Sequence, residues 1–108
     1  VEKNGVHVLS EIIELDGGSI KDILFQLKGE YPSFFGVIGG KENDKCSLSI
    51  IASDDLVKDK DIHAGNIIRE VSKHIQGGGG GQAFFATAGG KNPAGLKDAI
   101  AAVLEKLN

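Results

Sequence analysis

With 108 residues, of which 41% are hydrophobic and 25% charged, the chain is long enough to form one compact domain with its own hydrophobic core. No apolar run approaches the roughly 18 residues that a membrane-spanning helix requires, so no membrane partner is expected. The formal net charge of −3 excludes a protein that binds nucleic acid by bulk positive charge alone. The single cysteine, Cys46, excludes an internal disulfide and favours a cytoplasmic protein.

The chain opens with a strand and a helix. Residues 6–15, VHVLSEIIEL, are rich in β-branched residues and predict the strand. Ser19 and Asp22 resemble a capping box, which predicts a helix that begins near Ser19. Four apolar residues follow at the helical spacing, namely Ile20, Ile23, Leu24 and Leu27. We expect this face of the helix to be buried.

A pair of strands and a connector are predicted next. Residues 34–40 and 46–53 are apolar or alternating segments joined by a polar turn, which is typical of two neighbouring strands. The charged stretch 54–61 lacks the carboxylate spacing and the glycine of a calcium-binding loop. We therefore expect residues 54–61 to form a solvated loop.

The last third of the chain predicts two helices that flank a glycine run and a strand. Residues 62–76 form the first of these helices, with a buried stripe of Ala64, Ile67, Ile68, Val71 and Ile75. Residues 83–88 predict a short strand. A final helix begins at Asn92 and Pro93, with core-facing residues Leu96, Ile100, Val103, Leu104 and Leu107.

The predicted order is β-α-β-β-α-β-α, which favours the α/β (α+β) class. We expect a single-layer mixed sheet of about four to five strands, packed by three helices. No boundary divides the sequence, so residues 1–108 are expected to form one domain. The sequence contains no Met, which predicts that the chain is a fragment of a longer one.

The glycine run is the most informative feature of the sequence, and it consists of Gly77, Gly78, Gly79, Gly80 and Gly81. Such a run is typical of a flexible linker, but the residues after it are too few to fold alone. Gly77 is expected to end the preceding helix in the αL conformation. Each further ordered glycine costs about 0.5–1 kcal/mol relative to alanine. A glycine-rich loop that a ligand approaches closely explains this cost, and a simple turn of the chain is the alternative.

Basic residues lie on both sides of the glycine run. Arg69 and Lys73 are one helical turn apart just before it, and we interpret them either as RNA contacts or as solvated surface. Gly89, Gly90 and Lys91 follow a strand and precede a helix, where free amides and the positive helix end favour a phosphate. An ordinary turn with a surface lysine is the alternative there.

The sequence does not predict a metal site or a catalytic site. The cysteine and the three histidines show neither CxxC nor HxxxH spacing. The glycine run follows a predicted helix, whereas a phosphate-binding P-loop follows a strand and ends in Gly-Lys-Ser/Thr. No nucleophile motif such as Gly-x-Ser-x-Gly is present. We expect binding rather than catalysis, with no cofactor in these residues.

Residues 63–93, HAGNIIREVSKHIQGGGGGQAFFATAGGKNP, carry a family resemblance. They resemble the C-terminal domain of alanyl-tRNA synthetases, a domain family shared with DHH phosphoesterases. The shared motifs are His-Ala-Gly at 63–65, glycines at 77–81 and Ala-Thr-Ala-Gly-Gly-Lys at 86–91. Many family members carry a basic residue after the glycines, where this chain has Gln82. Phe84 is then either a stacking face for a base or a core residue.

The resemblance implies a role for the domain within a larger enzyme. In the family this domain holds the outer corner, or elbow, of tRNA and so supports aminoacylation and editing of tRNA(Ala). Because an elbow is common to all tRNAs, we expect little discrimination among them. The parent would be an ATP-dependent, cytoplasmic alanine–tRNA ligase, whose ATP, magnesium and zinc sites lie elsewhere. The expected partners are tRNA, the rest of the synthetase and a second copy of the chain. The expected nucleic-acid contacts are Arg69, Lys73, Gly77, Gly78, Gly79, Gly80, Gly81, Gly89, Gly90 and Lys91.

Two other functions remain open from the sequence. The first is the substrate-binding accessory domain of a DHH-family phosphoesterase. That branch typically ends its glycine run with a histidine, so Gln82 favours the synthetase. The second is a dimerisation module of the synthetase.

Overall fold

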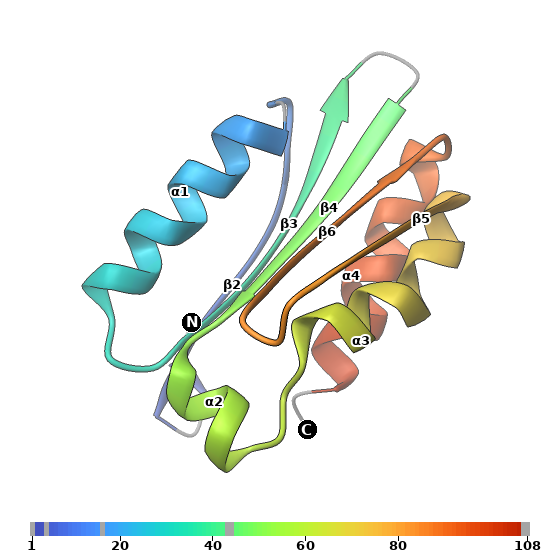
Figure 1. Ribbon diagram of the computed structural model, residues 1–108. Helices are drawn as coiled ribbons and strands as arrows, with labels where there is room; N and C mark the ends of the chain where they lie inside the picture. Colours follow the sequence, from blue (N-terminus) through green and yellow to red (C-terminus); the bar gives the residue numbers. More distant parts are fainter. Residues whose placement is uncertain (1, 4, 16, 43–44, 107–108) are drawn as a thin grey trace.

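The computed structural model describes residues 2–3, 5–15, 17–42 and 45–106. These residues form one mixed sheet with helices on both faces (Figure 1). The strands are β1 (Glu2–Lys3), β2 (Val6–Ile13), β3 (Phe34–Glu42), β4 (Lys45–Ala52), β5 (Gly77–Gly81) and β6 (Phe85–Gly90). The helices are α1 (Gly17–Glu30), α2 (Asp54–Asp59), α3 (Ala64–Val71) and α4 (Leu96–Glu105), with 3-10 turns η1 (Ser72–Ile75) and η2 (Pro93–Gly95).

The strand order in the sheet is β1-β2-β3-β4-β6-β5, so the glycine strand β5 forms one edge. β2 and β3 pair in parallel, and the other neighbouring pairs are antiparallel. The prediction of a single mixed sheet packed by helices is therefore confirmed. Among the described residues, no helix combines the length and apolar character needed to cross a membrane.

Five local features of the structure differ from the predictions. Residues 77–81 form a paired strand instead of a loop, and β1 is an additional short strand, which together raise the strand count to six. Residues 54–59 form α2 instead of a solvated loop, because Leu56 is almost completely buried against the core. α1 begins at Gly17, two residues before the predicted start. Gln76, and not Gly77, adopts the αL conformation that ends the helix before β5.

Helix α1 covers one face of the central strands. Its core cluster consists of Ile20, Leu24, Phe34, Ile38 and Ile51. Two glycines of β3 permit this close approach. A Cβ at Gly36 would lie 2.7 Å from Leu24 Cδ2, and a Cβ at Gly40 would lie 2.7 Å from Ile20 Cδ1. Because α1 packs on β3 and β4, the same face of β6 and β5 extends beyond the helix (Figure 1).

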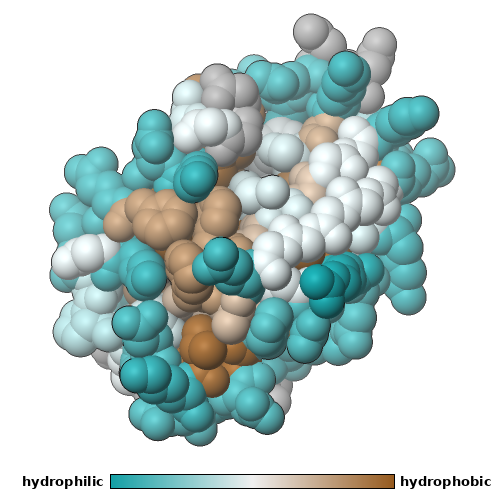
Figure 2. Space-filling view, in the orientation of Figure 1, coloured by the Kyte–Doolittle hydropathy of each residue, from teal (hydrophilic) through white to brown (hydrophobic). Residues whose placement is uncertain are grey.

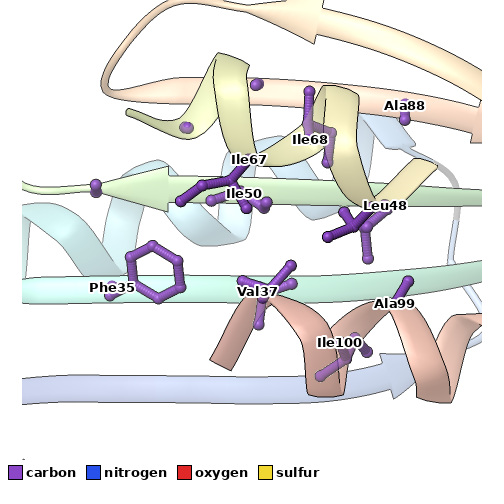
Figure 3. Packing of buried hydrophobic residues seen from close by; sticks show 14 of the residues in the cluster. Phe35, Val37, Leu48, Ile50, Ile67, Ile68, Ala88, Ala99 and Ile100 are labelled. Atoms are coloured by element: carbon purple, nitrogen blue, oxygen red, sulfur yellow. The ribbon is translucent and has the colours of Figure 1, made fainter. Parts of the chain in front are cut away.

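Helices α3 and α4 cover the opposite face of the sheet and bury the larger core cluster. Val37 of β3 and Leu48 and Ile50 of β4 point toward these two helices, as Figure 3 shows. The buried stripe predicted for residues 62–76 is confirmed, since Ala64, Ile67, Ile68, Val71 and Ile75 are all buried. In the last helix Leu96, Ile100 and Val103 are buried and Leu104 is half-buried, while Leu107 lies outside the described residues.

The start of α2 is tied to the start of β3 by hydroxyl groups. Ser53 Oγ accepts a hydrogen bond of 3.0 Å from the backbone N–H of Phe34. The hydroxyls of Ser33 and Ser53 both donate to the carboxylate of Asp55. These two hydrogen bonds favour the charged carboxylate and lower the pKa of Asp55 from its ordinary value of 3.8.

We expect Asp55→Asn to lower the free energy of unfolding at neutral pH and to lose this effect in acid. The folded-state pKa lies below the unfolded one, so the carboxylate contributes fully above about pH 4 and progressively less as the pH falls through the folded-state value. Urea unfolding of both proteins across this pH range measures the difference. A difference that is independent of pH would contradict the role of the charged carboxylate.

Candidate nucleic-acid interface

The pairing of β5 with β6 explains three of its five glycines. A Cβ at Gly77 would lie 1.8 Å from the carbonyl oxygen of Gly89, and one at Gly79 would lie 2.1 Å from that of Thr87. A Cβ at Gly81 would lie 2.5 Å from a third carbonyl oxygen of β6. Real Cβ atoms do not approach backbone oxygens this closely. Gly77, Gly79 and Gly81 are therefore required by the sheet itself.

Gly78 and Gly80 are not required by the packing of the sheet. A Cβ at Gly78 would meet no described atom within 4 Å, and the same is true of Gly89, its partner on β6. A Cβ at Gly80 would meet only the guanidinium group of Arg69, at 3.7 and 3.8 Å, among the described residues. We call Gly78, Gly80 and Gly89, with the exposed Thr87 opposite Gly80, the glycine floor. Because its side chains are small or absent, another molecule can reach the backbone there.

A cluster of lysines and phenylalanines lies beside the glycine floor. Phe25 of α1 is 37% exposed, and its ring centroid lies 5.0 Å from that of Phe85 and 6.4 Å from that of Phe84. Lys21 Nζ lies 5.9 Å from the Phe25 ring centroid and 5.7 Å from that of Phe85. Lys28 Nζ lies 5.9 Å from the Phe25 centroid and 5.0 Å from that of Phe84. Such distances are typical of cation–π contacts.

A groove of about 330 Å³ separates α1 from the β5–β6 hairpin. It is lined by Lys21, Phe25, Gly80, Gly81, Gln82, Phe84, Phe85, Ala86 and Thr87. The described lining includes no Asp or Glu, so its only formal charge is positive. Figure 2 shows this region as a brown apolar patch with hydrophilic residues around it, next to the pale band of β5 and β6.

The His-Ala-Gly motif at the start of α3 holds the turn of this hairpin. The backbone N–H groups of Ala64 and Gly65 donate to the carbonyl oxygens of Ala83 and Gln82, at 2.9 and 3.0 Å. His63 caps the helix, since its Nδ1 accepts a hydrogen bond of 3.1 Å from the N–H of Asn66. The first amides of α3, which have no partner within the helix, are thereby satisfied. The His63 side chain therefore has a structural role as the cap of α3.

The other end of the hairpin is held by the end of η1. The backbone N–H groups of Lys91 and Asn92 both donate to the carbonyl oxygen of Ile75, at 2.9 and 3.0 Å. The Asn92 side-chain amide donates to the carbonyl oxygen of His74 at 3.2 Å. These amides close the end of a helix, so the sequence argument that they are free for a phosphate does not hold. Lys91 keeps an exposed side chain.

The predicted basic contacts lie along the same hairpin. Arg69 reaches the edge strand at Gly80, and its Nη1 donates a hydrogen bond of 3.3 Å to Asn66 Oδ1. Lys73 is exposed in η1, the segment that precedes β5. Glu70 pairs with Lys106, and this ion pair, with a smaller contribution from Lys73, lowers the pKa of Glu70. The structure thus brings Arg69 to the glycine floor and leaves Lys73 and Lys91 toward the other end of the hairpin.

Sequence reasoning missed the contribution of α1 to this surface. Lys21, Phe25 and Lys28 are spaced at i, i+4 and i+7, so they share one helical face. This cation–aromatic–cation pattern was a detectable signal. The position of this helical face beside β6 could not be predicted, because it depends on how α1 packs across the sheet. Among the described residues, no three His, Cys, Asp or Glu side chains come close enough to hold a metal ion.

Residues 5–108 match the family model described as the DHHA1 domain, so the chain belongs to the DHHA1 domain family. Within it, the chain is similar to alanine–tRNA ligases. It is 54% identical over 97 residues to the ligase of Christiangramia forsetii, and the match covers 90% of this chain and 11% of that protein. It is 49% identical over 105 residues to the ligase of Parabacteroides distasonis, and the match covers 96% of this chain and 12% of that protein.

The fold has a solved counterpart, the C-Ala domain from the alanyl-tRNA synthetase of Aquifex aeolicus. The TM-score is 0.83 at 25% identity, over 99% of this chain and 98% of that one. The predicted resemblance to the C-terminal domain of alanyl-tRNA synthetases is therefore confirmed, together with the fold class. The chain spans 11–12% of the length of the two ligases described above.

The two kinds of glycine in β5 predict substitutions of opposite sign. We expect Gly79→Ala to destabilise the protein by about 1–3 kcal/mol, because its Cβ collides with the backbone of β6. Gly78→Ala has open space around it and restricts the unfolded chain, so it should stabilise the fold by up to about 1 kcal/mol. Urea unfolding measures the change in unfolding free energy for each variant. Equal effects of the two substitutions would contradict the division of the β5 glycines into two kinds.

The cap of α3 gives a further prediction. His63→Ala removes the acceptor for the Asn66 amide and should cost about 0.5–2 kcal/mol of unfolding free energy. His63→Asn keeps a side-chain acceptor at the cap and should recover most of that loss. Thermal unfolding of the three proteins provides the comparison. The cap has no such role if His63→Ala is as stable as the unchanged chain.

Proposed function

We propose that this domain is the tRNA-binding C-terminal unit of an alanine–tRNA ligase and that it holds the elbow of tRNA. The observation that carries the proposal is the glycine floor next to the lysine–phenylalanine cluster. An RNA elbow exposes loops, sugar edges and phosphates in place of an open major groove. A surface without side chains, flanked by aromatic rings and cations, suits recognition by shape, stacking and backbone contact.

The distribution of charge supports this proposal. The chain as a whole carries a formal charge of −3, yet Lys21, Lys28 and Arg69 gather around the floor and the groove. A phosphate backbone on this face meets positive groups at short range. The net negative charge elsewhere keeps nonspecific binding of nucleic acid weak.

Within the whole ligase, the grip would support aminoacylation and editing of tRNA(Ala) by holding a part of the tRNA far from the acceptor end. ATP, magnesium and zinc would be used by other parts of that enzyme, in the cytoplasm. The alternatives are an accessory domain of a DHH phosphoesterase and a dimerisation module. The similarity to the ligases described above favours the tRNA-binding role over that of a phosphoesterase accessory domain. Light scattering measures the molar mass of the chain in solution and so tests the dimerisation alternative.

We expect the chain to bind intact tRNA and to ignore an acceptor-stem minihelix that lacks the elbow, as measured by fluorescence anisotropy across a salt titration. Arg69→Ala, Lys73→Ala and Lys91→Ala should each weaken binding, and each lost phosphate contact should reduce the salt slope by about 1. Lys97→Ala serves as the matched control, since Lys97 is an exposed lysine of α4 that lies beside Ser10, Glu11 and Ile12 of β2, near the edge of the sheet opposite to β5.

Foreign tRNAs should compete nearly as well as tRNA(Ala), because the elbow is common to all of them. Competition by the minihelix, or equal weakening by Lys97→Ala, would contradict elbow binding at the β5–β6 hairpin. A chain that binds no tRNA at low salt would contradict the proposed function altogether.

A further inference from the structure

We propose that the groove between α1 and the β5–β6 hairpin receives a single unstacked nucleobase of the bound RNA. This inference rests on the proposed function and specifies one contact within it. The groove of about 330 Å³ lies at the lower end of the 300–1,000 Å³ that is typical of small-ligand pockets. It is therefore suited to one ring system and not to an RNA helix.

The aromatic walls of the groove provide the stacking surfaces. Phe25 lines the groove with 37% of its surface exposed, while Phe84 and Phe85, which also line it, are half-buried. The Phe25 and Phe85 rings are inclined at 50°, and the Phe25 and Phe84 rings at 78°. The three rings are thus not stacked on one another, and a base that stacks on Phe25 takes the place of the lysine ammonium groups, which lie 5.9 Å from its centroid. Base–aromatic stacking tolerates any base, because every base has a π-face.

The charges around the groove select a nucleotide over an apolar peptide. Lys21 and Lys28 lie before and after Phe25 along α1, and each ammonium group is within 6 Å of two ring centroids. Both ammonium groups can therefore reach phosphates on either side of an inserted base. The described lining contains no carboxylate that would compete for these cations. The Gln82 amide both donates and accepts hydrogen bonds, so it can pair with the edge of any base.

The groove is continuous with the glycine floor, which accounts for the sugar and phosphate of the same nucleotide. Gly80 lines the groove and also belongs to the floor. The Arg69 guanidinium lies 3.7–3.8 Å from the position that a Cβ of Gly80 would occupy. A base in the groove thus brings its ribose over Gly80 and a phosphate to Arg69. A side chain at position 80 would fill the space that the ribose needs.

The test uses a short single-stranded RNA with one 2-aminopurine, whose fluorescence is quenched when it stacks on an aromatic ring. With the unchanged chain we expect quenching and binding. Phe25→Leu keeps an apolar side chain but removes the ring, so it should abolish the quenching and weaken binding about tenfold, a loss of about 1.4 kcal/mol. Phe25→Tyr keeps the ring and should restore both signals.

Tyr31→Leu is the matched control, because Tyr31 is an equally exposed aromatic residue, at 36%, outside the groove. A duplex that pairs the 2-aminopurine should show no change of fluorescence when the chain is added, because the base stays inside the helix. Unchanged quenching and affinity in Phe25→Leu would overturn the inference, as would equal losses in Tyr31→Leu. Intact tRNA separates the two proposals. If tRNA binds the unchanged chain but is insensitive to Phe25→Leu, the groove inference fails and the proposed function stands.

Discussion

Backbone hydrogen bonds at the two ends of one helix hold a strand that has no side chains of its own. The first amides of α3 bond to the carbonyl groups of Gln82 and Ala83, and the last carbonyl of η1 accepts the amides of Lys91 and Asn92. The hairpin is therefore held at its turn and at its open end by the helix that precedes it. Without these contacts, five glycines at a sheet edge would gain little from ordering, since glycine loses more conformational entropy on folding than any other residue. The rest of the candidate interface depends on this arrangement.

The second constraint is the placement of α1. It packs on β3 and β4, where Gly36 and Gly40 let it approach closely, and it does not extend across β6 and β5. The opposite face of the sheet is covered by α3 and α4, whose side chains form the larger core. One side of the glycine hairpin is thus supported while its other side stays open beside α1. The floor, the groove and the cations of α1 meet there because of that asymmetry.

Much of the fold could be predicted from the sequence where hydrophobic periodicity was strong. The stripe from Ala64 to Ile75 was predicted correctly because it repeats over several helical turns. α2 was missed because a single buried residue, Leu56, sets no period, and its six residues carry mostly charge. β5 was missed as a strand because glycine has no intrinsic preference for one, and pairing with β6 decides its conformation. Of the site, the glycines and basic residues near them were found by composition, whereas Phe25 and its two lysines required knowledge of tertiary packing.

The division of the glycines into two classes changes what the run implies about binding. Gly77, Gly79 and Gly81 are accounted for by the sheet, so a long glycine run is not in itself a sign of a ligand. A contact with another molecule is indicated only by Gly78, Gly80 and Gly89, at which the protein leaves room for a side chain. A surface of this kind, with three cations at its border, releases few counterions when RNA binds, so stacking and shape must supply much of the affinity. Such a contact depends on salt less steeply than a basic cleft does. It is therefore suited to assist an enzyme that holds the same tRNA elsewhere, where the linked contact acts at high effective concentration.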